Sequence, residues 1–190
     1  FSLSALAQNE PVTISWWHIQ TETEHRELWQ DLADEYMAEN PNVNIEITVM
    51  ENENFKAKMT TVMQSGEVPD LFQSWGGGTM NDQAEAGLLK DITEYLDKDG
   101  WRETFSEGAL GVYAYKGRNY GVPRDMGMVG FWYNKELFAR AGIDSPPETW
   151  SELFDAIQKL KDADIIPIAL GEGDKWTGAF YWEYLAARIG

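Results

Sequence analysis

The chain has 190 residues, no cysteine and a formal net charge of −17 at pH 7. Without cysteine, neither a disulfide framework nor a thiolate metal site is available. The acidic balance argues against nucleic acid and anionic membranes as partners, because phosphate binding needs clustered Lys and Arg. A hydrophobic fraction of 43% and an aromatic fraction of 13% predict a folded globular protein, and nine tryptophans supply flat rings for a core or for a sugar or aromatic ligand.

The first seven residues, 1–7, are similar to the end of a signal peptide. Ala5-Leu6-Ala7 fits the small-x-small cleavage pattern, which makes Gln8 the expected mature start. We therefore expect an exported protein. The sequence contains no run of about 18 apolar residues, the pattern of a transmembrane helix.

The first part of the chain alternates between strand and helix patterns. Strands are predicted at 12–17, at 43–50 and within 69–78. A capping box, Thr21 to Glu24, predicts a helix that Asn40-Pro41 ends, and a second helix is expected at 54–65 with Gly66 as its C′ residue. The order strand, helix, strand, helix, strand predicts an α/β fold with a parallel sheet covered by helices.

The later elements are less regular. We predict helices at 82–89 and 135–141, a helix opened by the capping box Thr149 to Glu152, and a last helical segment reaching Ile189. That third helix should turn Leu153, Phe154, Ile157 and Leu160 inward. Strands are expected at 128–133 and 165–170, and residues 116–119 read as a hairpin turn.

The stretch Pro69–Gly78 ends in an amide, a hydroxyl and an indole: Gln73, Ser74 and Trp75. Ligands of open α/β sheets bind outside the carboxyl ends of the strands, so this junction is a candidate binding edge. Gly76 to Gly78 could let the backbone approach a ligand or could only turn the chain, and Trp75 could be a core aromatic. No Gly-Lys-Ser/Thr follows the glycines, which argues against a phosphate loop.

Several motifs along the chain resemble the extracellular solute-binding proteins of ABC importers, in the group that binds sugars. The resemblance runs in order from about Val12 to Gly190. It rests on Trp16-Trp17, Pro-Asp-Leu-Phe-Gln at 69–73, Tyr-Gly-Val-Pro at 120–123, Phe-Trp-Tyr-Asn-Lys at 131–135, Pro-Glu-Thr-Trp at 147–150 and Ala-Leu-Gly at 169–171.

The resemblance implies a type II periplasmic-binding-protein-like fold, with two α/β lobes joined by a hinge and a sugar between them. After the signal-peptide remnant 1–7, residues 8–125 would form the first lobe, and 126–190 the hinge crossing and the start of the second. Family members are about twice this length, so the second lobe would be incomplete in this chain. The implied protein is a periplasmic monomer without a cofactor that passes sugar to an ABC permease and catalyses no reaction.

A neutral sugar requires convergent polar groups and aromatic plates. The resemblance implies seven ligand-binding residues: Trp16, Trp17, Glu22, Gln73, Trp75, Asp125 and Trp176. Adjacent strand residues face opposite ways, so one of the two neighbouring tryptophans is expected in the core. Glu22 could instead only cap its helix, and Arg124 could pair with Asp125. A carboxylate found in maltose-binding relatives is replaced here by Gly127, which argues against a maltose-type contact set.

Other candidates carry weaker signals. Tyr181 and Trp182 are expected to pack within their helix, and His18 is expected to be exposed to solvent. His18 and His25 lack neighbouring ligands at metal-binding spacing. The alternative function is a secreted carbohydrate hydrolase, which would need two opposed carboxylates. An adhesion module has no specific support.

Overall fold

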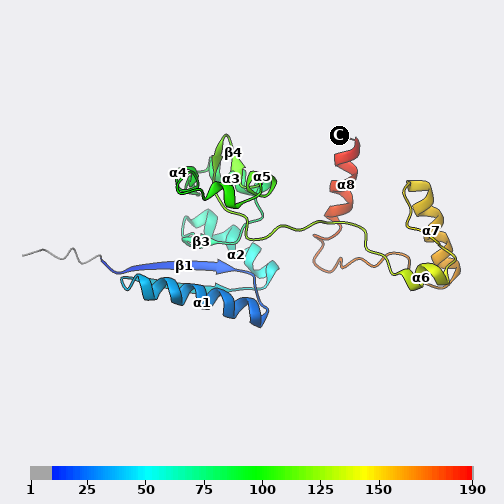
Figure 1. The fold of residues 1–190 in the computed structure, drawn as a ribbon, viewed down its shortest axis with the longest axis horizontal. Helices are drawn as coiled ribbons and strands as arrows, with labels where there is room; N and C mark the ends of the chain where they lie inside the picture. Colours follow the sequence, from blue (N-terminus) through cyan, green and yellow to red (C-terminus); the bar gives the residue numbers. More distant parts are fainter. Residues whose placement is uncertain (1–9, 190) are drawn as a thin grey trace, which may run out of the picture. The chain divides into compact units, whose positions relative to one another are not determined.

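The computed structural model describes residues 10–189 and divides the chain into two compact units, Phe1–Met126 and Gly127–Gly190 (Figure 1). The predicted signal-peptide remnant lies outside the described residues. The first unit contains β1 (Val12–His18), α1 (Thr23–Glu39), β2 (Val43–Val49), α2 (Asn52–Ser65), β3 (Leu71–Phe72), α3 (Gly77–Glu85), α4 (Thr93–Leu96), a 3₁₀ turn (Arg102–Thr104), α5 (Glu107–Gly111), β4 (Ala114–Tyr115) and β5 (Arg118–Asn119). The second contains α6 (Lys135–Arg140), α7 (Trp150–Asp162) and α8 (Ala179–Ile189).

The sheet of the first unit is parallel, with the strand order β2-β1-β3, which confirms the predicted β-α-β-α-β arrangement. In the register of the central strand, Trp16 lies opposite Ile47 on one side and Leu71 on the other. Side chains alternate between the two faces of a strand. Trp16 packs against Trp29 of α1, whereas Trp17 meets Lys58 of α2, so these two helices cover opposite faces of the sheet.

The best-buried apolar side chains of the first unit lie on the helices. Phe55 and Met59 of α2 and Met80 of α3 are almost fully buried, as is Ala33 of α1. Gly66 ends α2 in the left-handed conformation expected of a C′ glycine. This packing holds the start of α2 against the sheet whose carboxyl edge carries the candidate site.

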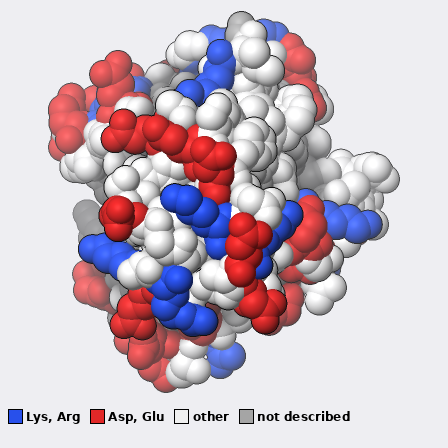
Figure 2. Space-filling model, turned by 90° about the vertical axis from the view of Figure 1, so that its right-hand side faces the viewer, with Lys and Arg blue, Asp and Glu red and all other residues white. Residues whose placement is uncertain are grey.

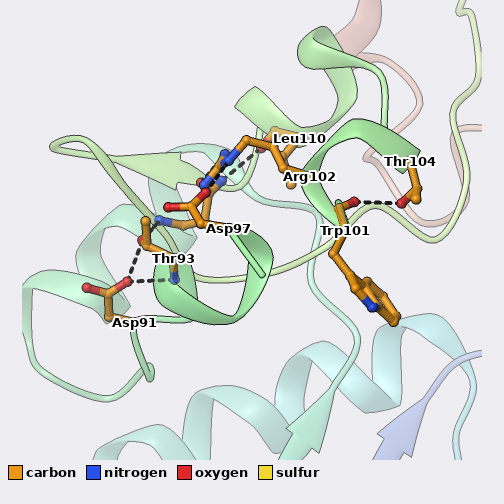
Figure 3. A network of polar contacts seen from close by, with 8 residues as sticks. Asp91, Thr93, Asp97, Trp101, Arg102, Thr104 and Leu110 are labelled. Carbon is orange, nitrogen blue, oxygen red and sulfur yellow. Dashed lines mark hydrogen bonds and ion pairs between the residues drawn. The ribbon is translucent and has the colours of Figure 1, made fainter. Parts of the chain in front are cut away.

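A polar network joins α4, the 3₁₀ turn and α5 (Figure 3). The hydroxyl of Thr93 donates to Asp91 over 2.6 Å, and Nε of Arg102 donates to Asp97 over 2.6 Å. The side chain of Asn119, on β5, is buried; it accepts from Arg102 over 3.0 Å and donates to the carbonyl of Leu110 over 3.4 Å. The network thereby anchors the β4-β5 hairpin, whose turn at 116–117 confirms the predicted one.

The second unit, described by itself, has a small core in which Ile143 packs with Ala156 and Leu160 of α7. The capping box of α7 is confirmed, since Thr149 and Glu152 exchange hydrogen bonds with each other's backbone. Phe154, predicted to face inward, is exposed. The strands predicted at 128–133 and 165–170 are wrong, because these segments are irregular among the described residues and pair with no strand there.

Two helix starts also differ from the predictions. Glu22, with extended backbone, occupies the N-cap of α1 and makes no side-chain capping bond, so the capping box predicted from Thr21 is wrong. Helix α3 begins at Gly77, five residues before the predicted 82, and thus follows the candidate binding edge directly.

Surface charge is mixed in sign where Figure 2 shows it, with acidic side chains interspersed among basic ones. Within residues 10–189, no helix combines the length and apolar character needed to cross a membrane.

Candidate functional site

The carboxyl ends of the strands bring the residues after β1 and β3 together. The backbone N–H of Gln73 donates to the carbonyl of Trp17 over 2.9 Å, and that of Met50 donates to the carbonyl of His18 over 3.0 Å. The three strands therefore end at one edge, where side chains from separate parts of the chain can meet one ligand.

The loop from Gln73 to Gly76 is held by hydrogen bonds within the loop and by one from Tyr113. The Ser74 carbonyl accepts from the side-chain amide of Gln73 over 3.1 Å and from the hydroxyl of Tyr113 over 3.2 Å. The Ser74 hydroxyl accepts from the N–H of Gly76 over 3.1 Å. The sequence did not point to Tyr113, because it lies in a stretch with no readable helix or strand period.

Gly76 supports this loop through a close backbone approach. Its φ of +67° is left-handed, and a Cβ built on it would lie 2.5 Å from the carbonyl oxygen of Val112. The neighbouring N–H of Gly77 donates to that same oxygen over 3.2 Å. Because Gly76 has no side chain, the backbone of this loop can contact the backbone carbonyl of Val112.

The three predicted tryptophans of the first unit differ in their surroundings. Trp16 is half-buried, with its ring centroid 5.3 Å from that of Trp29. Trp17 is half-buried on the opposite face. Trp75 is 50% exposed and rests edge-to-face near Phe55, with ring centroids 6.0 Å apart. Trp75 thus presents the most open ring of the three at this edge.

His18 is buried, so the prediction that it is exposed is wrong. Its Nδ1 accepts from the N–H of Gln20 over 3.2 Å, while its Nε2 is buried without a hydrogen-bond partner among the described residues. Burial, with a smaller effect from Arg124, lowers the pKa of His18 and favours the neutral imidazole.

Arg124 and Asp125 form an ion pair with 2.5 Å between the guanidinium and the carboxylate. Burial raises the pKa of Tyr113, the Asp125 carboxylate raises it further, and the Arg124 guanidinium opposes this with a smaller lowering effect. Both charged residues therefore lie close enough to influence the tyrosine that bonds Ser74.

Two further predicted site residues, Glu22 and Trp176, have local partners of their own. Glu22 is exposed, 3.5 Å from Nδ1 of His25, and its own backbone N–H is the main cause of the lowered pKa of its carboxyl group. Trp176, in the second unit, packs edge-to-face against Phe180 with ring centroids 5.7 Å apart. In that unit Tyr181 packs against Phe131 as predicted, whereas Trp182 is 71% exposed, so the packing predicted for it is wrong.

The first unit thus brings Trp17, Gln73 and Trp75 to one sheet edge, where Tyr113 braces the loop and Asp125 lies close enough to Tyr113 to influence its pKa. An amide, an ion pair and an open indole suit a neutral ligand that offers hydroxyl groups and an apolar face. Among residues 10–189, no group of three or more His, Cys, Asp or Glu side chains could hold a metal ion.

Comparison with known proteins gives a consistent match. The model of one protein family, bacterial extracellular solute-binding protein, matches residues 21–190. A maltotriose-binding protein of Pyrococcus abyssi is 33% identical over 146 residues, which cover 77% of this chain and 30% of that protein. An uncharacterised ABC transporter extracellular-binding protein of Pyrococcus horikoshii is 27% identical over 180 residues, covering 92% of this chain and 40% of that protein.

Solved structures that resemble this chain are also binding proteins. A chitin oligosaccharide binding protein aligns with a TM-score of 0.78 and 31% identity, over 89% of this chain and 43% of that one. A galacto-N-biose- and lacto-N-biose I-binding protein of an ABC transporter from Bifidobacterium longum aligns with a TM-score of 0.65 and 27% identity, over 82% of this chain and 39% of that one. These structures confirm the α/β, type II periplasmic-binding-protein-like fold class, of which the chain spans less than half.

Proposed function

We propose that this chain, which belongs to the bacterial extracellular solute-binding protein family, forms part of the sugar-binding subunit of an ABC importer. In this proposal residues 8–125 supply the first lobe, and 126–190 supply the hinge crossing and the beginning of the second lobe. The chain spans only 30% to 40% of the length of the two curated relatives described above. The complete ligand site therefore needs contacts from outside these residues.

The observation that carries this proposal is the loop from Gln73 to Gly76 at the sheet's carboxyl edge. Its backbone is held by Tyr113 and Ser74, which fixes the position from which Gln73 and Trp75 meet a ligand. The fixed amide can hydrogen-bond a sugar hydroxyl, and the half-exposed indole can stack on the C–H face of a sugar ring. Fixing these groups before binding reduces the entropic cost of association.

The other predicted contacts stay proposals. The contact of Trp16 with Trp29 supports a packing role for Trp16, so we propose Trp17 as the ligand-facing member of the pair. Asp125 would accept from sugar hydroxyls while Arg124 holds its carboxylate. Glu22 and Trp176 would contribute from the start of α1 and from the second unit.

The proposed protein is exported to the periplasm, acts as a monomer and delivers its sugar to a membrane permease without chemical conversion. The names of the matched relatives support transport, since they are binding proteins of ABC transporters. Lobe closure around the ligand would present the loaded protein to the permease by a hinge motion.

The direct test incubates the complete protein with a panel of mono- and oligosaccharides. We expect one class of sugar to raise the melting temperature with a dissociation constant near micromolar, a binding free energy of about −8 kcal/mol. Chromatography of the recovered sugar should show it intact. Binding to none of the sugars, or the appearance of new reducing ends, would reject the proposal, and the second result would favour a hydrolase.

Trp75→Ala tests the loop itself. We expect it to weaken sugar binding at least tenfold while lowering the free energy of unfolding only slightly, because half of the indole is already in solvent. Trp101→Ala is the matched control, since Trp101 is 57% exposed in the same unit but lies at the N-cap of the 3₁₀ turn. Equal losses of binding and stability at Trp75 would make this ring a packing residue.

A further inference from the structure

Lys58 covers the ring of Trp17. Its ammonium nitrogen lies 4.2 Å from the centroid of the indole. Lys58 projects from α2, whose buried Phe55 and Met59 fix the helix against the sheet. The lysine itself is exposed, and the ring beneath it is half-buried.

The position of Lys58 over Trp17 matters because cations and sugars both bind to the face of an indole. The ring quadrupole concentrates negative charge on the face, which attracts a lysine ammonium within about 6 Å. The C–H groups of a sugar carry a small positive charge and stack on that same electron-rich face. An ammonium and a sugar therefore compete for the covered face of Trp17.

Trp75 provides the contrast within the same site. Lys56, from the same helix, lies 5.4 Å from its ring centroid, farther than Lys58 lies from Trp17, and half of Trp75 is open to solvent. Both indoles thus have a lysine within about 6 Å, but the cation lies closer to Trp17, and Trp75 is the more exposed ring.

We infer that Lys58 is a specificity-determining residue, which weakens the stacking of neutral sugars on the ligand-facing Trp17 and makes Trp75 the main stacking plate. This inference rests on the proposed sugar site. A neutral sugar that engages Trp17 must first displace the ammonium, which lowers its affinity by the free energy of the cation–π contact. The covered ring therefore restricts where along the edge a sugar ring can stack.

The test replaces Lys58 with methionine in the complete protein and measures sugar binding by calorimetry. Methionine keeps the length of the side chain and removes its charge. We expect Lys58→Met to bind neutral sugar about two- to fivefold more tightly, the change that corresponds to an exposed cation–π contact. Lys58→Arg should bind sugar no more tightly than the wild type, because a guanidinium also stacks on the face of an indole.

Two controls separate this effect from a change of net charge. Lys90→Met removes a cation that lies 4.9 Å from the ring centroid of Tyr95, in the same unit, and should leave sugar affinity unchanged. In a Trp17→Ala background, Lys58→Met should no longer tighten binding. Unchanged or weaker binding by Lys58→Met, or tightening that persists without Trp17, would overturn the inference.

A measurement without ligand keeps the test independent of the proposed function. In protein labelled with ¹⁵N-tryptophan, the indole N–H resonance of Trp17 should shift in Lys58→Met and stay in place in Lys90→Met. A wild type that binds no sugar would refute the proposed function, while the resonance would still report the contact. Sugar binding with no response of either affinity or resonance to Lys58→Met would refute only the role of Lys58.

Discussion

Ser15 and Asp70 hold β1 and β3 together through a reciprocal set of hydrogen bonds. The backbone N–H and the hydroxyl of Ser15 both donate to one carboxylate oxygen of Asp70, over 2.9 and 2.7 Å, and the N–H of Asp70 donates back to the Ser15 hydroxyl over 3.1 Å. Because β3 has only two residues, this clamp supplies much of what fixes the strand that leads to the candidate site.

We therefore expect Asp70→Ala to lower the free energy of unfolding by about 1–2 kcal/mol, near the low end for hydrogen bonds to a charged group because the carboxylate is exposed to solvent. The bonds from Ser15, the backbone N–H first, lower the pKa of Asp70. A folded-state pKa below the unfolded value stabilises the fold above about pH 4, and this contribution is lost as the pH falls through the folded value. Urea unfolding from pH 7 to pH 2 measures both effects.

Glu67→Ala is the control for Asp70, since it removes an exposed carboxylate just before β3. It should leave stability near neutral pH within about 0.5 kcal/mol of the wild type. If both variants lose the same stability, the clamp contributes nothing beyond its charge.

Gly76 offers a graded test of the loop. Alanine at Gly76 would have a left-handed backbone and a Cβ only 2.5 Å from the Val112 oxygen, whereas Gly77 has a similar φ of +64° with nothing within 4 Å. The positive φ costs alanine about 1–2 kcal/mol, and at Gly76 the ψ of −152° adds to this cost because that region is essentially confined to glycine. We expect Gly76→Ala to be destabilised by at least about 2 kcal/mol more than Gly77→Ala, because backbone atoms must move. Thermal unfolding of the two variants decides this, and equal losses would mean that the Val112 contact relaxes freely.

Tyr113 is the residue at this edge that the sequence did not single out. Tyr113→Phe removes the donor to the Ser74 carbonyl, which keeps its bond from Gln73. The expected loss of stability is about 1 kcal/mol, and sugar binding should weaken more than it does in Tyr36→Phe, where the ring is exposed on α1. Calorimetric titration of both variants measures the difference, and equal affinities would show that the loop does not need this brace.

Much of the first unit could be predicted because its signals are local. The β-forming run from Val12 indicates a strand, and the helical spacing of Phe55 and Met59 indicates which side of α2 is buried; the structure has both. The brace from Tyr113 to Ser74 could not be predicted, because it joins residues 39 positions apart through a single hydroxyl.

Two of the failed predictions concern elements whose formation depends on more than the local sequence. An apolar run such as Ile165 to Leu170 has strand propensity, but a strand forms only when a neighbouring strand pairs with its backbone. No described segment of the second unit supplies one. Likewise, the tetrapeptide from Thr21 to Glu24 has capping-box composition, but the backbone places Glu22 at the N-cap, where the threonine cannot reach the expected N–H.

The buried imidazole of His18 should make the stability of the first unit depend on pH in mild acid. Burial, with a smaller contribution from Arg124, lowers the pKa of its imidazole, so the unfolded chain binds a proton more readily than the folded one. Stability should therefore fall as the pH drops below about 6.5, by at most about 1.4 kcal/mol per pH unit for one proton, and level off below the folded-state pKa. His18→Gln should flatten this slope in urea unfolding between pH 7.5 and pH 5, whereas His25→Gln, on the exposed surface of α1, should keep it. A slope that survives His18→Gln would assign the acid sensitivity to another group.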